Sequence, residues 1–428
     1  MIMSRSGTIL HERGTHQLFR STIRRVWRLC IAALLATTIV LPCACAQGRQ
    51  REEHRPAFRY FAATGHNLGG PFLSFYDTHG GEPIFGAPLT ETIDGDPQIQ
   101  YFERARLERR GHAVSLSLLG SELTAGRGEA TFAPLAASPA PDRLFYTQSG
   151  HTLGGAFQFF WQTTGGLPVF GYPISEEFVE DGTLVQYFER SRFEYRPDIP
   201  DPHVSISPLG YTYARLMGVR DNQLAAAPPI VPLGTAAIAI YDSARHNVAL
   251  AAEKIDGATI APGATFSFLE AIDEVSQRNG YTQGQAIVDG GIGTVIGGGI
   301  CYVATALYRA AFLAGLPIVE RRAHSLALAS FSDIPGFDAA VDTIGLDLRW
   351  RNDTPSTIAI AAELYGGQLS ITLWGIGDGR STTMRGPTVK RDTTTQHVTI
   401  GRVVRAASGA LIRKETVQSH YRIAQGDL

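Results

Sequence analysis

The sequence predicts a multidomain α+β protein in which two small repeat units precede a mixed α+β domain and a C-terminal β-hairpin tail. The chain has 428 residues, and domains usually contain about 100–200. Several sequence blocks recur in its first half, and helix-like and strand-like segments alternate in its second half. A hydrophobic share of 44% excludes a wholly disordered chain. The formal net charge of −2 gives no sign of nucleic-acid binding, which normally needs a basic surface.

The first 46 residues have the organisation of a secretory signal. Four arginines within residues 20–28 precede an apolar run at residues 29–41, and Ala44 and Ala46 suit the −3 and −1 positions of a cleavage site. We therefore predict removal of residues 1–46 and a secreted or extracytoplasmic cell-envelope location. Two alternatives stay open, namely an uncleaved membrane anchor and lipidation of Cys45. Membrane contact is expected only in these two cases.

An internal repeat spans residues 56–124 and 142–219. The matching blocks are residues 66–70 and 151–155, 80–86 and 165–171, and 100–104 and 186–190. Each unit is too small to bury its apolar face alone, so we expect the two copies to pack together. The blocks resemble the LGFP-type repeats of secreted and cell-wall-associated bacterial proteins, with residues 83–86 (PIFG) and 168–171 (PVFG) at the core positions.

Each repeat also carries a tyrosine and an arginine in its last matching block. These residues are Tyr101 and Arg104 in the first copy and Tyr187 and Arg190 in the second. One interpretation is an aromatic and cationic surface that binds a cell-wall glycan. The other is that the tyrosines belong to the repeat core and the arginines form surface ion pairs, and we favour this second interpretation.

A Pro/Ala-rich linker at residues 222–232 leads into a continuous globular segment, which we assign to residues 233–375. Residues 378–395 are polar and predict irregular structure. Two strand-like segments follow within residues 396–424, around a Ser-Gly turn. We expect them to form a β-hairpin that packs on another part of the chain, because an isolated hairpin is only marginally stable in water.

Cys301 is the first candidate for a reactive group. The other three cysteines lie within residues 1–46, so the mature chain cannot form an internal disulfide. Three glycines precede Cys301, and the segment after it predicts a helix that runs to about residue 314 and stops at Gly315. A cysteine at a helix N-terminus is favoured as a thiolate by the helix dipole. The alternative is a small buried apolar side chain.

A histidine and an acid follow this predicted helix. A predicted strand at residues 318–322 ends at His324 and Ser325, so we expect His324 on this strand close to the Cys301 sulfur, and Asp338 lies further on. A cysteine at a helix start with a histidine and an acid on later strands is the layout of papain-like and transglutaminase-like nucleophiles. The candidate catalytic set is therefore Cys301 as nucleophile, His324 as base and Asp338 as its orienting acid. The candidate binding residues around this set are Gly297, Gly298, Gly299, Tyr302 and Ser325.

Metal ions and cofactors are not expected. No group of His, Cys, Asp and Glu has metal-ligand spacing. The glycines at 297–299 do not form a phosphate-binding loop, because no Lys-Ser/Thr pair follows them. Their function is more simply a close approach of the backbone to another strand or to a ligand.

The segment from about residue 241 to 375 resembles the VanW family of bacterial envelope proteins. The matching blocks are residues 245–252, 262–268 (PGATFSF), 297–301 (GGGIC), 314–316, 320–321, 324–325, 336–341, 347–348 and 352–354. The resemblance implies a cell-envelope or peptidoglycan-associated role, without a settled biochemical activity. This chain departs from the family pattern at Tyr302 and Ala304, where the family usually has Gln and Ser. His246 and Asn247, in the first block, are interpreted as helix-surface or buried structural residues.

Two functions follow from these observations. The first is a cell-wall binding or scaffold protein in which the Cys301 region has a structural role. The second is a thiol hydrolase or acyltransferase acting on cell-wall peptide. The glutamine that Tyr302 replaces could have stabilised an oxyanion, so we favour binding over catalysis from sequence alone. The expected partner is cell-wall glycan or peptide, and no nucleic acid.

Overall fold

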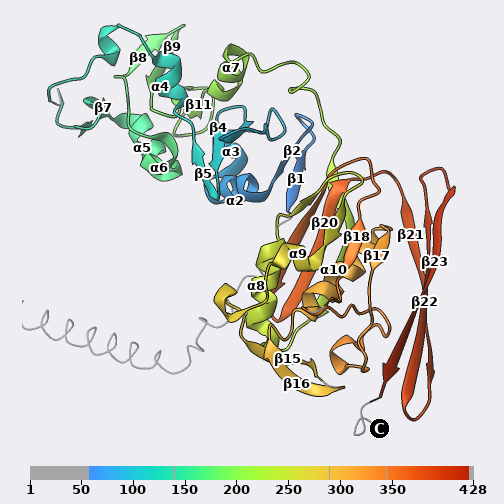
Figure 1. Ribbon diagram of the computed structural model, residues 1–428. Coiled ribbons are helices and arrows are strands. Elements are labelled where there is room, and N and C mark those ends of the chain that lie inside the picture. Colours follow the sequence, from blue (N-terminus) through green and yellow to red (C-terminus); the bar gives the residue numbers. More distant parts are fainter. Residues whose placement is uncertain (1–56, 138–139, 289, 344, 424–428) are drawn as a thin grey trace, which may run out of the picture. The chain divides into compact units, whose positions relative to one another are not determined.

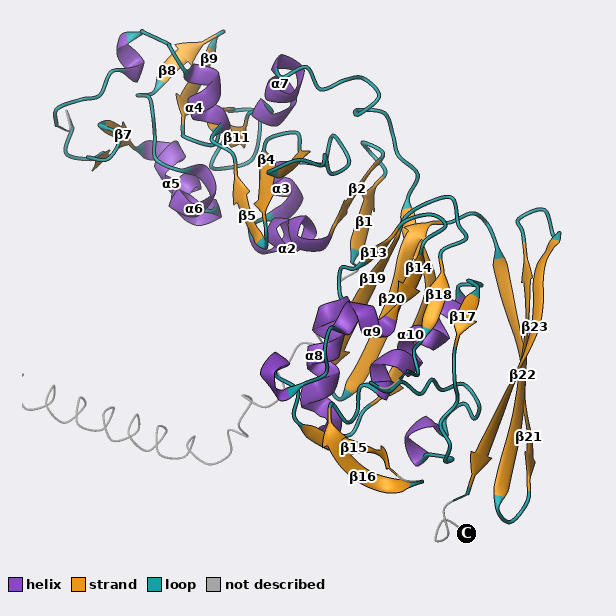
Figure 2. Cartoon of the chain, in the orientation of Figure 1, coloured by secondary structure: helices purple, strands orange, loops and turns teal. Residues whose placement is uncertain are grey.

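The structure, a computed structural model, describes residues 57–423 apart from residues 138–139, 289 and 344. The predicted signal at residues 1–46 lies outside these residues. In the described part of the chain, no helix has the length and apolar character needed to cross a membrane. Helices and several small sheets are both present, which confirms the predicted α+β class (Figure 1; Figure 2).

The two repeats have similar orders of elements. Each starts with an antiparallel strand pair, continues with two short helices, and ends with a small antiparallel sheet and a last helix. The first copy contains β1 (Phe58–Phe61), β2 (His66–Gly69), α2 (Gly70–Thr78), α3 (Gly81–Phe85), β3 (Gln98–Tyr101), β4 (Arg106–Arg110), β5 (Ala113–Leu116) and α4 (Leu119–Thr124). The second contains β6 (Leu144–Tyr146), β7 (His151–Leu153), α5 (Gly155–Thr164), α6 (Gly166–Phe170), β8 (Phe178–Glu180), β9 (Thr183–Tyr187), β10 (Arg192–Tyr195), β11 (Val204–Ile206) and α7 (Leu209–Leu216).

The two repeats share one hydrophobic core, as expected from their small size. Phenylalanines of both copies belong to the same buried cluster, among them Phe72, Phe85, Phe102, Phe157, Phe170, Phe188 and Phe193. The last helix of each copy packs against the other copy. A Cβ atom on Gly120 in α4 would lie 1.8 Å from the carbonyl oxygen of Phe188, and one on Gly210 in α7 would lie 2.0 Å from that of Phe102. Glycine therefore permits this reciprocal backbone contact at both positions.

The following segment is built on a four-stranded antiparallel sheet with the order β12 (Ile230–Ala239), β20 (Gln368–Ile376), β19 (Ile358–Tyr365) and β13 (Thr259–Ile260). Helix α10 (Cys301–Leu313) packs against β12 and β20, and α8 (Arg245–Ile255) packs against β19 (Figure 2). Residues 302–312 of α10 are all buried. Apart from Thr305 and Arg309 these residues are apolar or aromatic, and a helix that is largely apolar on all sides belongs inside a core.

Smaller elements surround this core. A three-stranded sheet has the order β14 (Thr265–Ser267), β18 (Arg349–Arg351) and β17 (Ile318–Glu320). Strands β15 (Gln283–Val288) and β16 (Gly291–Ile296) form a separate hairpin. Short helices complete the domain, at α9 (Phe268–Ile272), η3 (Asp242–Ala244), η4 (Gln277–Asn279) and η5 (Ala329–Phe331).

The C-terminal segment is a three-stranded antiparallel sheet of β21 (Ser381–Arg391), β22 (Thr395–Arg405) and β23 (Leu411–Arg422). The predicted hairpin is present as β22 and β23. The expectation of irregular structure at residues 378–395 is wrong for β21, which is an edge strand with mostly exposed side chains and therefore lacks an apolar alternation. Arg402 anchors the sheet to the core, because its guanidinium donates to the carbonyl oxygens of Phe312 and Leu316 at 2.8 and 2.6 Å.

Candidate active site

Cys301 is the first residue of α10, and the helix ends at Leu313. This confirms the predicted helix boundaries. The preceding loop depends on its glycines, since Gly297 and Gly299 have φ angles of 78° and 106°, a region that side chains disfavour. A Cβ atom on Gly298 would lie 2.1 Å from the backbone of Gly284 in β15. The glycines thus allow the loop to lie directly against the β15–β16 hairpin, as the sequence suggested.

Asn247 of α8 holds this glycine loop in place. Its amide nitrogen donates to the carbonyl oxygens of Gly298 and Thr282, each at 2.9 Å, and its side-chain oxygen accepts from the backbone N–H of Thr282 at 2.9 Å. The side chain is buried and fully engaged, which agrees with the structural role expected for it. Neighbouring His246 is exposed and contacts the carbonyl oxygen of Gly280 at 2.8 Å.

His324 is positioned by a carboxylate and an aromatic ring. Its Nδ1 atom lies 2.5 Å from Oδ2 of Asp338, and its backbone N–H donates to the same oxygen at 2.9 Å. The imidazole stacks on Phe331 with 4.9 Å between ring centroids. The expectation that His324 lies on a strand is wrong, because β17 ends at Glu320 and His324 follows in an irregular segment. There its backbone N–H is free to bond the carboxylate instead of a neighbouring strand.

Asp338 is 2% exposed and receives several further hydrogen bonds. Arg321 Nη2 donates to its Oδ1 atom at 3.0 Å, and Arg321 Nε donates to its backbone carbonyl oxygen at 2.6 Å. The hydroxyl of Tyr421, in β23, donates to Oδ1 at 2.5 Å. The C-terminal sheet therefore supplies a direct partner of this buried carboxylate.

The sulfur of Cys301 completes the cluster. It lies 3.5 Å from the carbonyl oxygen of Val341, and it lines the same pocket as the His324 imidazole. Burial by itself lowers the pKa of His324, but the hydrogen bond to Asp338 and the interaction with Cys301 outweigh burial and raise it to about 10. Burial also raises the pKa of Asp338, but its bonds to His324 and the charge of Arg321 hold that pKa well below its usual range. At neutral pH the site thus contains an imidazolium between a carboxylate and a sulfur atom.

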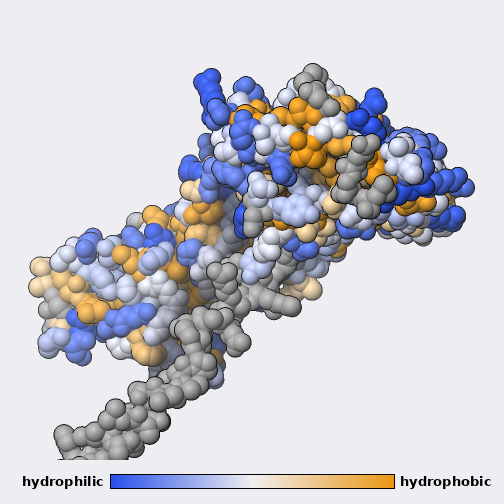
Figure 3. All heavy atoms as spheres, turned by 90° about the horizontal axis from the view of Figure 1, so that it is seen from below, coloured by the Kyte–Doolittle hydropathy of each residue, from blue (hydrophilic) through white to orange (hydrophobic). Residues whose placement is uncertain are grey.

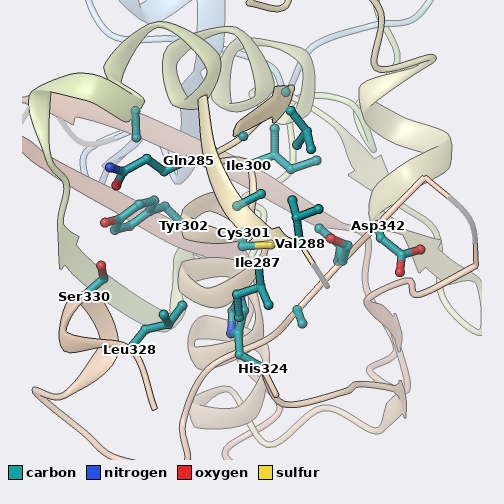
Figure 4. A pocket seen from close by; sticks show the side chains of 18 of the residues that line it. Gln285, Ile287, Val288, Ile300, Cys301, Tyr302, His324, Leu328, Ser330 and Asp342 are labelled. Atoms are coloured by element: carbon teal, nitrogen blue, oxygen red, sulfur yellow. Dashed lines mark hydrogen bonds between the residues drawn. The ribbon is translucent and has the colours of Figure 1, made fainter. Parts of the chain in front are cut away.

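A pocket of about 660 Å³ opens beside Cys301, a size typical of small-molecule sites. Its walls come from the β15–β16 hairpin, the glycine loop, the start of α10 and the segments around His324 and Val341 (Figure 4). Gly297, Gly298, Gly299, Tyr302 and Ser325 all line it, so the structure brings this predicted set together around the sulfur.

Tyr302 occupies the position where the sequence departs from the family pattern. It is buried, its ring centroid lies 5.3 Å from that of Phe331, and burial raises its pKa. Phe331 in turn stacks on His324. Tyr302 therefore supports the aromatic ring beneath the imidazole, which is a packing role that a glutamine would not fill in the same way.

The four predicted residues of the repeats have a different setting. Tyr101 and Tyr187 are 2% and 8% exposed and belong to the interior of the repeats. Arg104 and Arg190 donate to backbone carbonyl oxygens at 3.0 and 3.3 Å. The burial of the tyrosines agrees with a place in the repeat core, and Arg190 also pairs with Glu189 at 3.7 Å. Glycan contact by these residues remains a prediction.

Sequence reasoning missed several residues of this cluster. Arg321 and Phe331 lie close to His324 in sequence, and the positive charge of Arg321, three residues before His324, was an available signal. Tyr421 had no such signal, because it lies 83 residues after Asp338. Among the described residues, no three metal-ligating side chains converge into a metal site.

Comparisons with known proteins place this site in a known type of domain. Residues 243–374 match the family described as VanW like protein, so the chain contains a VanW-like domain. An uncharacterized protein of Bacillus subtilis (strain 168), YoaR, is 38% identical over 132 residues, which cover 31% of this chain and 43% of YoaR. The vancomycin B-type resistance protein VanW of Enterococcus faecalis (strain ATCC 700802 / V583) is 32% identical over 117 residues, covering 27% of this chain and 42% of that protein. The chain thus spans less than half the length of these relatives.

Proposed function

We propose that this protein is a cysteine-dependent hydrolase or acyltransferase of the cell envelope, with Cys301 as nucleophile. The observation that carries the proposal is the buried His324, whose imidazole bonds the Asp338 carboxylate and lines the same open pocket as Cys301 (Figure 4). A purely structural cysteine would not need a charged and buried imidazole next to it, because burying a charge without a function is costly. The geometry therefore reverses the preference for binding that the sequence alone favoured.

The proposed reaction proceeds through a covalent acyl-enzyme. The Cys301 thiolate attacks the substrate carbonyl carbon, and the oxygen that becomes negative is stabilised by the positive end of α10. The His324 imidazolium then donates its proton to the departing group. Neutral His324 next takes a proton from water or from an acceptor, which attacks the thioester and releases Cys301. Asp338 keeps the imidazole oriented throughout.

The cell-envelope setting rests on several supports. Residues 1–46 have the features of a secretory signal, and the repeats resemble LGFP-type repeats of wall-associated proteins. One relative of the VanW-like domain is named a vancomycin resistance protein. We propose that the repeats attach the protein to cell-wall glycan or peptide while the VanW-like domain carries the reaction.

Trapping of the nucleophile tests the catalytic proposal. The full chain is treated with limiting iodoacetamide at pH 7, and alkylation of Cys301 is followed by peptide mass spectrometry. We expect rapid labelling that falls at least tenfold in His324→Ala, because that change removes the cationic partner of the thiolate. Ser325→Ala is the matched control, since Ser325 lines the same pocket without contacting Asp338. Labelling that appears only after denaturation would contradict the proposal.

A further inference from the structure

The pocket beside Cys301 has an apolar wall as well as polar groups. Its lining contains a series of aliphatic side chains from separate segments, including Ile287, Val288, Ile292, Val295, Leu328 and Leu346. Figure 4 shows Ile287, Val288 and Leu328 in the pocket that also contains the Cys301 sulfur. Burying an apolar group of a ligand against such a wall is favourable. Burying a peptide backbone there contributes little, because its polar groups must keep their hydrogen bonds.

The hairpin that forms one wall exposes apolar side chains to an unusual extent. Ile292 is 60% exposed, and Val288 and Val295 are 39% and 38% exposed. The hairpin lies at the lower end of its domain in Figure 1, and the view from below in Figure 3 shows hydrophobic surface on that face. Exposure of apolar side chains to water is unfavourable. Their presence together on the rim of an open pocket therefore indicates contact with a ligand.

The charges in the pocket add a second and independent constraint. His324 and Asp342 carry the ionisable charges beside Cys301, and no lysine or arginine is among the described residues that line the pocket. The imidazolium of His324 is already engaged by Asp338. A substrate with a free carboxylate would thus find no lysine or arginine to pair with among the described lining residues, and this disfavours its binding.

From these observations we infer that the group transferred through Cys301 is an uncharged, apolar acyl chain, delivered as a thioester or ester. This inference rests on the proposed function and names its substrate class. In the reaction, the bond from Cys301 Sγ to the acyl carbon forms while the bond from that carbon to the thiol or alcohol breaks. The released thiol or alcohol leaves with the His324 proton. A hydroxyl, amine or water then accepts the acyl chain and restores the thiolate and the imidazolium.

A series of p-nitrophenyl esters with acyl chains of two to ten carbons tests the inference on the full chain. The leaving group is constant, so any trend in kcat/KM reports on the acyl site. We expect kcat/KM to rise about three- to fourfold per added methylene until the pocket is filled. Ile292→Ser should remove most of this rise for long chains, because it replaces an apolar side chain of the pocket wall with a hydroxyl group. Val319→Ser is the matched control, because Val319 is 57% exposed but does not line the pocket.

The outcomes separate the inference from the proposed function. Acylation of Cys301 that does not depend on chain length, or a preference for a peptide ester ending in a free carboxylate, would overturn the inference and leave the thiol mechanism intact. If no ester acylates Cys301, the proposed mechanism is refuted. Ligand binding then tests whether the pocket prefers an apolar group. Cys301→Ala is then titrated with octanamide and propanamide by calorimetry. Tighter binding of octanamide supports an apolar ligand, and equal or undetectable binding of the two amides refutes it.

Discussion

Removal of one hydroxyl group, in Tyr421→Phe, tests whether the C-terminal sheet supports the candidate active site. Tyr421 is 6% exposed, and its hydroxyl donates to Asp338 Oδ1 at 2.5 Å. The variant keeps the ring and loses the hydrogen bond. Hydrogen bonds to charged groups contribute about 1.5–3 kcal/mol, so we expect the free energy of unfolding to fall by about 2 kcal/mol. The fall is limited because Arg321 still donates to the same oxygen at 3.0 Å.

A structural role alone would change stability and nothing else, so the second measurement is the pH dependence of Cys301 alkylation. The bond from Tyr421 helps to hold the pKa of Asp338 low. Its loss should raise that pKa. The acid limit of labelling, which is the pH below which iodoacetamide no longer labels Cys301, should therefore move to higher pH. Urea unfolding measures the stability, and labelling between pH 3 and 9, read by peptide mass spectrometry, measures the acid limit.

Tyr308→Phe is the matched control for this variant. Tyr308 is equally buried in the same core, and its hydroxyl has no hydrogen-bond partner among the described residues. Removing an unpaired buried hydroxyl should be neutral or stabilising, and the labelling profile should not move. If the two tyrosine variants behave alike in both measurements, the reasoning that links β23 to Asp338 is refuted.

Three further predictions concern the same cluster. Asp338→Asn should destabilise the protein by about 3–5 kcal/mol in urea unfolding, because it leaves the buried Arg321 charge uncompensated, and a loss under 1 kcal/mol would argue against the buried ion pair. The raised pKa of His324 should stabilise the fold fully below pH ~6.5, and this stabilisation should decline as pH rises to about 10; unfolding midpoints measured across this range should show the decline in wild type and much less of it in Asp338→Asn. Gly298→Ala should lower stability by about 1–3 kcal/mol and slow Cys301 labelling through overpacking, whereas the control Gly291→Ala, whose added Cβ would meet its nearest neighbour at 3.9 Å, should leave both unchanged.

Local signals in the sequence were enough to predict much of this protein. The glycine run before Cys301 and Gly315 after the helix mark the two ends of α10 through their backbone geometry. The limits of this helix could therefore be predicted correctly. The duplication of short blocks likewise predicted two units that pack together, because neither could bury its apolar face alone. Polar edge strands carry no such signal, and β21 was therefore missed.

Only the tertiary structure decided how these parts meet. Cys301, His324 and Asp338 come from separate segments, and the contacts that set their ionisation involve Tyr421 from the last strand of the chain. Such contacts depend on how distant elements pack, and no periodicity or spacing in the sequence encodes them. The same holds for the tyrosines of the repeats, which the sequence could assign to either surface or core. Tyr101 is buried in a cluster with Leu209 and Tyr213 of the second copy, and Tyr187 is buried against Phe132 and Phe178, so packing between segments decided their burial.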